Sequence, residues 1–207
     1  MADLFIVRLN RVDLLTLSGV LSAGMAVGLA LAGQPLLATS LLFVAMLGDA
    51  LDGIWARKRG ITREFGRYLD GFMDMLIYLV GPSMVWYQGL LPGLWGLPLL
   101  GLIACGAIRL SVFNQTGNVE STNGGMAYLG LPVFWTVFLL AGSQLMALLI
   151  PVSVLRPLMV IILVAMSLAM LWRRPFFKFT ALWQILLLTL GGAGLFAVLH
   201  VYAGGAL

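Results

Sequence analysis

The sequence predicts an all-α integral membrane protein: a bundle of six core transmembrane helices, about one extra C-terminal helix and a short N-terminal interfacial helix. Of its 207 residues, 61% are hydrophobic and only 10% are charged, whereas ordinary soluble domains are roughly 25% charged. Apolar stretches of spanning length recur along the whole chain, and the polar gaps between them are short. These features exclude a soluble enzyme, a disordered chain and a nucleic-acid-binding domain, so no nucleic-acid partner is expected.

The apolar stretches divide the chain into seven expected spans, separated by glycine and proline turn signals such as Gly33-Gln34-Pro35 and Pro151. The spans are expected at residues 14–33, 36–57, 66–88, 92–114, 126–150, 153–172 and 179–203. The first is expected to be a retained helix, because it is long for a cleaved signal sequence. Residues 1–12 favour an interfacial helix or, alternatively, an unstructured terminus. We expect residues 1–207 to form a single transmembrane domain.

The basic residues predict how this bundle is oriented. If the N-terminus is cytoplasmic, the loops near 58–65, 115–125 and 173–178 are also cytoplasmic. Of the twelve Lys and Arg residues, only Arg156 then falls at the outer end. Cytoplasmic loops carry the excess of positive charge in membrane proteins. The sequence therefore predicts a multi-pass protein of the inner or plasma membrane, with this basic end in the cytoplasm.

Four acidic residues lie in apolar surroundings near the cytoplasmic end: Asp49, Asp52, Asp70 and Asp74. A carboxylate inside a bilayer costs about 2.5–3.5 kcal/mol on insertion scales, so each needs a partner or a function. Asp49 and Asp52 are three residues apart, and Asp70 and Asp74 are four apart, so each pair forms one acidic helix face. A short basic loop folds the two helices antiparallel, which allows the faces to converge.

Converging carboxylates repel one another unless cations neutralise them. Oxygen ligands suit hard divalent ions, above all Mg²⁺ or Mn²⁺, and Mg²⁺ in proteins is commonly bound by carboxylates together with substrate phosphates. This chemistry indicates phosphoryl or pyrophosphate transfer in a membrane. The alternative is that the acids form structural ion pairs with Arg57, Lys58 or Arg67.

Small residues and one arginine extend these acidic faces. Gly53 and Ala56 follow Asp52, and Gly66 lies one turn before Asp70. Small side chains let a ligand approach the backbone, although they also serve helix packing in membranes. Arg57 lies beside the face, where it can hold a phosphate or act as a positive-inside anchor.

The run Asp49-Ala-Leu-Asp52-Gly53-Ile-Trp-Ala56-Arg57, then eight residues, then Gly66-Arg-Tyr-Leu-Asp70-Gly-Phe-Met-Asp74, resembles the signature of the CDP-alcohol phosphatidyltransferase family. That signature reads D-x-x-D-G-x-x-A-R, eight residues, G-x-x-x-D-x-x-x-D, and every fixed position is matched. The signature covers only residues 49–74, whereas the six-helix core of the family would cover most of the chain.

The resemblance implies an activity and a set of roles. Enzymes of this family transfer a phosphatidyl group from a CDP-linked lipid such as CDP-diacylglycerol to a hydroxyl group and release CMP. By position, the four aspartates would bind two divalent ions, and Asp74 would also be the general base. The expected CDP-lipid site comprises Asp49, Gly53, Ala56, Arg57 and Gly66. The resemblance also implies a homodimer surrounded by membrane lipids.

Two further segments bear on the acceptor alcohol. Arg109-Leu-Ser-Val-Phe-Asn114 and Tyr128-Leu-Gly-Leu-Pro132 resemble segments of bacterial and archaeal phosphatidylserine synthases. The resemblance favours L-serine, with Arg109 and Asn114 as candidate acceptor-binding residues. Arg109 suits the carboxylate of serine or, equally, a lipid phosphate, and Asn114 is alternatively a helix cap. Other acceptors remain open: glycerol 3-phosphate, inositol phosphate or choline.

Two more distant functions are also compatible with intramembrane acids. A membrane prenyltransferase uses paired acidic motifs and Mg²⁺ on a pyrophosphate, but it does not require Gly53, Ala56, Arg57 and Gly66 at these intervals. A cation transporter or channel uses carboxylates along its ion path. Release of CMP from a CDP-lipid separates the proposed activity from both.

Overall fold

The computed structural model describes residues 6–60, 63–117, 119–120, 126–176, 179 and 181–203. Helices make up nearly all of this part, and the strands are short. The elements in chain order are α1 (Arg11–Leu31), α2 (Pro35–Arg59), α3 (Glu64–Asp74), η1 (Met75–Val80), α4 (Gly81–Gln88), η2 (Gly93–Gly96), α5 (Leu97–Thr116), β1 (Val119–Glu120), β2 (Met126–Leu129), α6 (Trp135–Ala147), α7 (Val152–Leu171), β3 (Pro175–Phe176) and α8 (Leu182–Tyr202).

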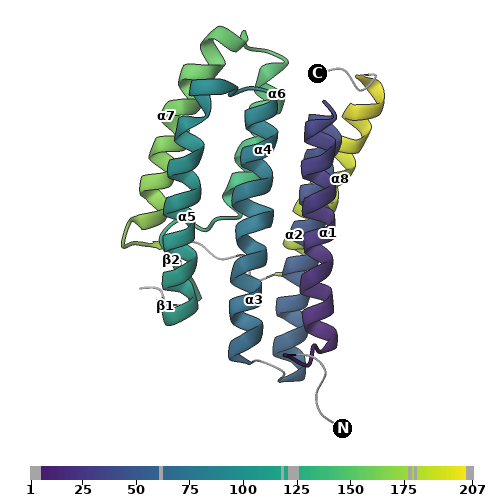
Figure 1. Ribbon diagram of the computed structural model, residues 1–207, viewed down its shortest axis with the longest axis vertical. Helices are drawn as coiled ribbons and strands as arrows, with labels where there is room; N and C mark the ends of the chain where they lie inside the picture. The colour runs from purple at the N-terminus through teal and green to yellow at the C-terminus, as the bar shows by residue number, and fades with distance from the viewer. Residues whose placement is uncertain are drawn as a thin grey trace.

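The long helices run side by side along the longest axis of the molecule (Figure 1). Among the described residues, five helices are long and apolar enough to cross a membrane: α1, the first part of α2, η2 with α5, α7 and α8. The segments α3, η1 and α4 follow one another without a break from Glu64 to Gln88. The prediction of an all-α integral membrane protein with an additional C-terminal helix is therefore confirmed.

The expected helix over residues 126–150 is wrong in its first third. Residues Met126–Leu129 form strand β2, and helix α6 begins only at Trp135. The reason is Gly130, which has φ +75°, and a Cβ there would lie 2.3 Å from the Met170 carbonyl oxygen. Strand β3 pairs with β2, and the Gly130 N–H donates to the Arg174 carbonyl at 3.0 Å. Non-helical backbone is tolerated at membrane depth where protein partners satisfy it in this way.

The predicted N-terminal interfacial helix is not present in residues 6–10, and residues 1–5 lie outside the described residues. Helix α1 begins at Arg11 because Asn10 caps it. The Asn10 side chain accepts a hydrogen bond from the Asp13 N–H at 2.8 Å, and the Asp13 carboxylate accepts one from the Asn10 N–H at 2.7 Å. This reciprocal capping box satisfies donors that the first helical turn leaves unpaired.

Helix α2 holds the centre of one half of the bundle, because it packs against both α1 and α8. Close contact with α8 depends on Gly192, where a Cβ would lie 2.7 Å from the Phe43 ring. The Phe43 ring in turn stacks on Phe196 of α8, with ring centroids 6.1 Å apart. Packing on two sides fixes the rotation of α2 about its axis, and with it the directions in which the acidic residues point.

Candidate functional site

A cavity of about 250 Å³ lies between α2, α3, η1, α5, the segment after β2 and the start of α8. Both polar and apolar side chains line it. The polar side chains are Asp49, Asp70, Asp74, Tyr78, Arg109 and Tyr128. The apolar lining includes Met46, Ala50, Ile54, Phe113, Pro132, Val133, Phe134, Phe179 and Ile185. A cavity lined by both polar and apolar side chains suits a ligand with a charged head and a lipid tail.

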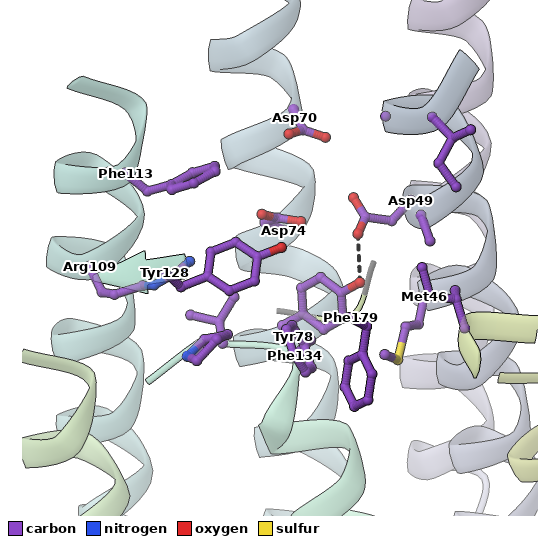
Figure 2. A pocket seen from close by; sticks show the side chains of 16 residues that line it. Met46, Asp49, Asp70, Asp74, Tyr78, Arg109, Phe113, Tyr128, Phe134 and Phe179 are labelled. Carbon is purple, nitrogen blue, oxygen red and sulfur yellow. Dashed lines mark hydrogen bonds between the residues drawn. The ribbon is translucent and has the colours of Figure 1, made fainter. Parts of the chain in front are cut away.

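Three of the predicted acids meet in this cavity. One carboxylate oxygen from each of Asp49, Asp70 and Asp74 lies within 4.8 Å of the others. Figure 2 shows the Asp49 carboxylate reaching from α2 toward the other two, which project from α3. The four-residue interval on α3 places its two acids about 40° apart around the helix, so both face α2.

The composition of this group fits a hard divalent cation. Two ionised carboxylates 4.8 Å apart repel by roughly 3.5 kcal/mol at an effective dielectric constant of about 20. The Asp74 Oδ1 atom is buried and has no hydrogen-bond partner in the described part of the chain. A buried oxygen without a donor needs compensation, and a cation that accepts oxygen ligands supplies it.

Asp52 lies elsewhere. Its side chain is buried, with 2% of its surface exposed, and it is absent from the group of three. The Thr16 hydroxyl of α1 donates to its Oδ2 atom at 2.5 Å. A three-residue interval turns the second side chain about 60° around the helix. On α2 that rotation is enough to direct Asp49 toward α3 and Asp52 toward α1.

Tyr78 is a site residue that the sequence analysis did not identify. Its hydroxyl donates to Asp49 Oδ2 at 2.6 Å, and its ring is buried in the cavity wall (Figure 2). The spacing in the sequence could have identified it. Tyr78 follows Asp74 by four residues, as Asp74 follows Asp70, and this interval places all three near one helix face.

Arg109 lies in the wall formed by α5 and is buried, with 6% of its surface exposed. Its guanidinium carbon lies 5.2 Å from the ring centre of Phe113 and 5.3 Å from that of Tyr128. The Nε and Nη2 atoms have no hydrogen-bond partner within the described ranges. The aromatic faces attract the cation without using its donors, which leaves hydrogen bonds for an anionic ligand.

Asn114, the other predicted acceptor residue, does not line the cavity. Its amide packs against α3, where a Cβ on Gly71 would lie 2.5 Å from the Asn114 Nδ2 atom. Its backbone carbonyl accepts a long hydrogen bond from Arg67 at 3.4 Å. These contacts hold the end of α5 against α3.

The residues predicted for the CDP-lipid site are only partly brought together. Gly53 lines the cavity, as does Asp49. Gly66 instead lies beside Asp13 and Arg63, which form an ion pair at the start of α1 and α3. The side chains of Ala56 and Arg57 lie outside the described residues.

Comparison with known proteins adds a second line of evidence. The chain is 34% identical to the CDP-diacylglycerol–serine O-phosphatidyltransferase of Bacillus subtilis, over 44% of this chain and 51% of that protein. It is 33% identical to the archaetidylserine synthase of Methanothermobacter thermautotrophicus, over 58% and 52%. A CDP-diacylglycerol–serine O-phosphatidyltransferase of Helicobacter pylori is 31% identical, over 58% and 51%. The chain thus spans about half the length of the curated relatives it matches.

The model of one protein family covers nearly the whole chain. The CDP-alcohol phosphatidyltransferase model matches residues 9–201, from just before α1 to the end of α8. The matched region includes every residue of the cavity wall. This chain belongs to the CDP-alcohol phosphatidyltransferase family.

Proposed function

We propose that this protein transfers a phosphatidyl group from CDP-diacylglycerol, or a related CDP-lipid, to the hydroxyl group of L-serine, and releases CMP. The observation that carries the proposal is the cavity itself. Three carboxylates converge on one side, a buried arginine with unused donors lies on another, and apolar side chains complete the wall. Family membership supports the reaction type, and the names of the relatives support serine.

In this proposal Asp49, Asp70 and Asp74 hold divalent ions, with Asp52 as the fourth acid of the motif. Bound Mg²⁺ or Mn²⁺, two ions by the resemblance, would stabilise negative charge on the pyrophosphate. The close approach of the three carboxylates supports the assignment of those ligands. Asp52 Oδ2 accepts a hydrogen bond from Thr16, and Asp52 is not one of the three acids whose oxygens lie close together.

Asp74 is the proposed general base. The serine hydroxyl oxygen forms a bond to the phosphorus that bears the diacylglycerol, and its proton passes to the Asp74 carboxylate. The bond from that phosphorus to the bridging oxygen breaks, and the oxygen leaves with CMP. An alcohol is a poor nucleophile near neutral pH, so a carboxylate beside it lowers the barrier. Asp74 lines the cavity in which this step would take place.

Arg109 is the proposed carboxylate-binding residue for serine. A guanidinium presents two parallel N–H donors to a carboxylate, and Nε with Nη2 forms one such edge. Both atoms are buried and unpaired in the described part of the chain. In this proposal Asn114 supports the site without lining the cavity, because it holds α5 against α3. Glycerol 3-phosphate, inositol phosphate and choline are the competing acceptors.

The CDP-lipid site is proposed to use Asp49, Gly53, Ala56, Arg57 and Gly66, of which Gly53 and Asp49 border the cavity. The apolar wall would take the start of the lipid tails. We propose that this end of the bundle faces the cytoplasm, because the basic residues gather there. CMP would leave and serine would arrive on that side. A homodimer in the inner or plasma membrane completes the proposal.

The deciding experiment supplies the purified protein with CDP-diacylglycerol, Mn²⁺ or Mg²⁺ and one acceptor at a time. The panel contains serine, glycerol 3-phosphate, inositol phosphate and choline, and the readouts are CMP and the new lipid. We expect CMP and phosphatidylserine with serine, and little of either with the others. New lipid with another acceptor reassigns the alcohol, and no CMP with any acceptor contradicts the activity.

A further inference from the structure

The helix that carries Asp70 and Asp74 changes its winding immediately after Asp74. Residues Met75–Val80 form a π-helical turn, in which the Gly81 N–H donates to the Leu76 carbonyl five residues earlier. Such turns are rare and occur frequently at functional sites. In an α-helix each four-residue step advances about 40° beyond a full turn. A π-turn rotates less per residue, so Tyr78 stays in line with the two acids.

The sequence provides a reason for this irregularity. Pro82 stands four residues after Tyr78, where an α-helix would need an N–H to donate to the Tyr78 carbonyl. Proline has no N–H, so the carbonyl loses its α-helical partner. The Thr136 hydroxyl of α6 contacts this oxygen instead, and it also lies 2.8 Å from the Val133 carbonyl oxygen of its own turn. Thr136 is fully buried, so its hydroxyl is not exposed to solvent in this structure.

These contacts form a chain from α6 to the acidic group. Thr136 binds the Tyr78 carbonyl, and the Tyr78 hydroxyl binds Asp49 Oδ2 at 2.6 Å. Asp49 belongs to α2, whereas Tyr78 belongs to the helix that bears the other two acids. The phenol therefore connects the two acidic helices directly and fixes the rotation of the one carboxylate that α2 contributes to the group of three.

We propose that Tyr78 is a positioning residue for Asp49 in the metal-binding group, and that Thr136 positions Tyr78 through its backbone carbonyl. The inference rests on the proposed function only for the assignment of the three acids as metal ligands. A side chain that holds a metal ligand in place typically changes metal affinity or activity by about 10–100-fold when it is removed.

The first test measures Mn²⁺ binding to the full-length protein in detergent, by electron paramagnetic resonance and without substrate. Tyr78→Phe keeps the ring and removes only the hydroxyl, and Tyr87→Phe makes the same change on an outer surface of α4. We expect the Kd for Mn²⁺ to rise about tenfold in Tyr78→Phe and to stay unchanged in Tyr87→Phe. Equal Kd values in the two variants overturn the proposal.

The second test examines the link to α6. Thr136→Val removes the hydroxyl at nearly constant size, whereas Thr136→Ser retains it. Thr189→Val is the matched control, because Thr189 is equally buried and donates within its own helix. We expect a rise of about threefold in the Kd for Mn²⁺ in Thr136→Val, and wild-type values in Thr136→Ser and Thr189→Val. If Tyr78→Phe does not fold, this series decides the proposal, and equal values across it overturn it.

CMP release by the wild type, measured in parallel, separates the two proposals. A wild type that binds Mn²⁺ but releases no CMP contradicts the proposed function, while the Kd values still decide the role of Tyr78. A wild type that binds no Mn²⁺ contradicts the metal assignment and overturns the positioning role with it. A purely structural Tyr78 would lower the melting temperature without changing the Kd, which also overturns the proposal.

Discussion

The two acidic pairs look alike in sequence but behave differently in the fold. On α3, Asp70 and Asp74 both enter the cavity. On α2, Asp49 enters it, whereas Asp52 accepts a hydrogen bond from Thr16 of α1. The difference shows that helical spacing brings two side chains to within about 60° of each other but does not choose their partners. Asp49 points toward the helix of α3 and η1, where the Tyr78 hydroxyl donates to it, and Asp52 points toward α1, where the Thr16 hydroxyl donates to it.

The largest expected effect on activity comes from substituting Asp70 or Asp74, the two acids of α3 that both enter the cavity. Asp74→Asn removes the proposed base and Asp70→Asn removes a charge beside it, so we expect CMP release to fall by about 10³-fold or more in each. The measurement is CMP formed from CDP-diacylglycerol and serine, with the melting temperature in detergent as a check on folding. Activity within tenfold of the wild type in both variants would remove the roles given to this pair.

The two acids of α2, Asp49 and Asp52, contact different helices, so their contributions to metal binding can be compared directly. Asp49 belongs to the group of three and Asp52 does not, so Asp49→Asn is expected to weaken Mn²⁺ binding more than Asp52→Asn. We expect the Kd to rise about 100-fold in the first variant and about tenfold in the second. Isothermal titration with Mn²⁺ measures both. Equal losses would mean that Asp52 turns away from Thr16 and joins the group when the ion binds.

Substitution of Arg109, on the α5 side of the cavity, tests the proposed binding of the serine carboxylate. Lysine keeps the charge but lacks the two-donor edge, so Arg109→Lys is expected to raise KM for serine about tenfold or more. KM for CDP-diacylglycerol should change by less than about twofold. Arg156→Lys is the control, because Arg156 donates to the Leu90 carbonyl far from the acidic group. A rise in KM for the lipid instead would assign Arg109 to a phosphate.

The smallest effect on metal binding is expected at Thr16. Thr16→Val leaves the buried Asp52 carboxylate without this hydrogen bond, which costs about 1–3 kcal/mol. The melting temperature should fall by about 2–4 °C or more, while the Kd for Mn²⁺ stays within about twofold. Thr116→Val, at an exposed position, is the control. A large change in the Kd would show that Asp52 and Asp49 act as one unit after all.

Much of the fold was predictable because helices in a membrane follow from local sequence. Apolar length gives the spans, since every backbone group must be satisfied within the membrane. The prediction was wrong at residues 126–134, where composition favours a helix. Gly130 and the pairing of β2 with β3 override it. That pairing joins residues more than 40 positions apart, and no periodicity of a single segment reports it.

The candidate site was likewise predictable in part. The spacing of Asp49, Asp52, Asp70 and Asp74 was enough to expect an acidic group. Arg109 was expected as an acceptor-binding residue, because the resemblance implied it. Asp49 and Asp52 were expected to point from one helix face toward the same site. The sequence did not reveal that Thr16 on α1 would donate a hydrogen bond to Asp52. Tyr78 was missed because a tyrosine between apolar residues resembles ordinary packing until its partner on another helix is known.

The sequence by itself determined the solvent in which this protein folds, the number and approximate limits of its apolar segments, and the chemical type of its site, because these depend on residue identity and on intervals along one helix. Only the tertiary structure decided which acids meet, what Tyr78 and Thr136 hold, and where the helix after β2 begins. Those outcomes depend on the rotation of each helix against its neighbours, which is set by packing contacts between residues distant in the chain.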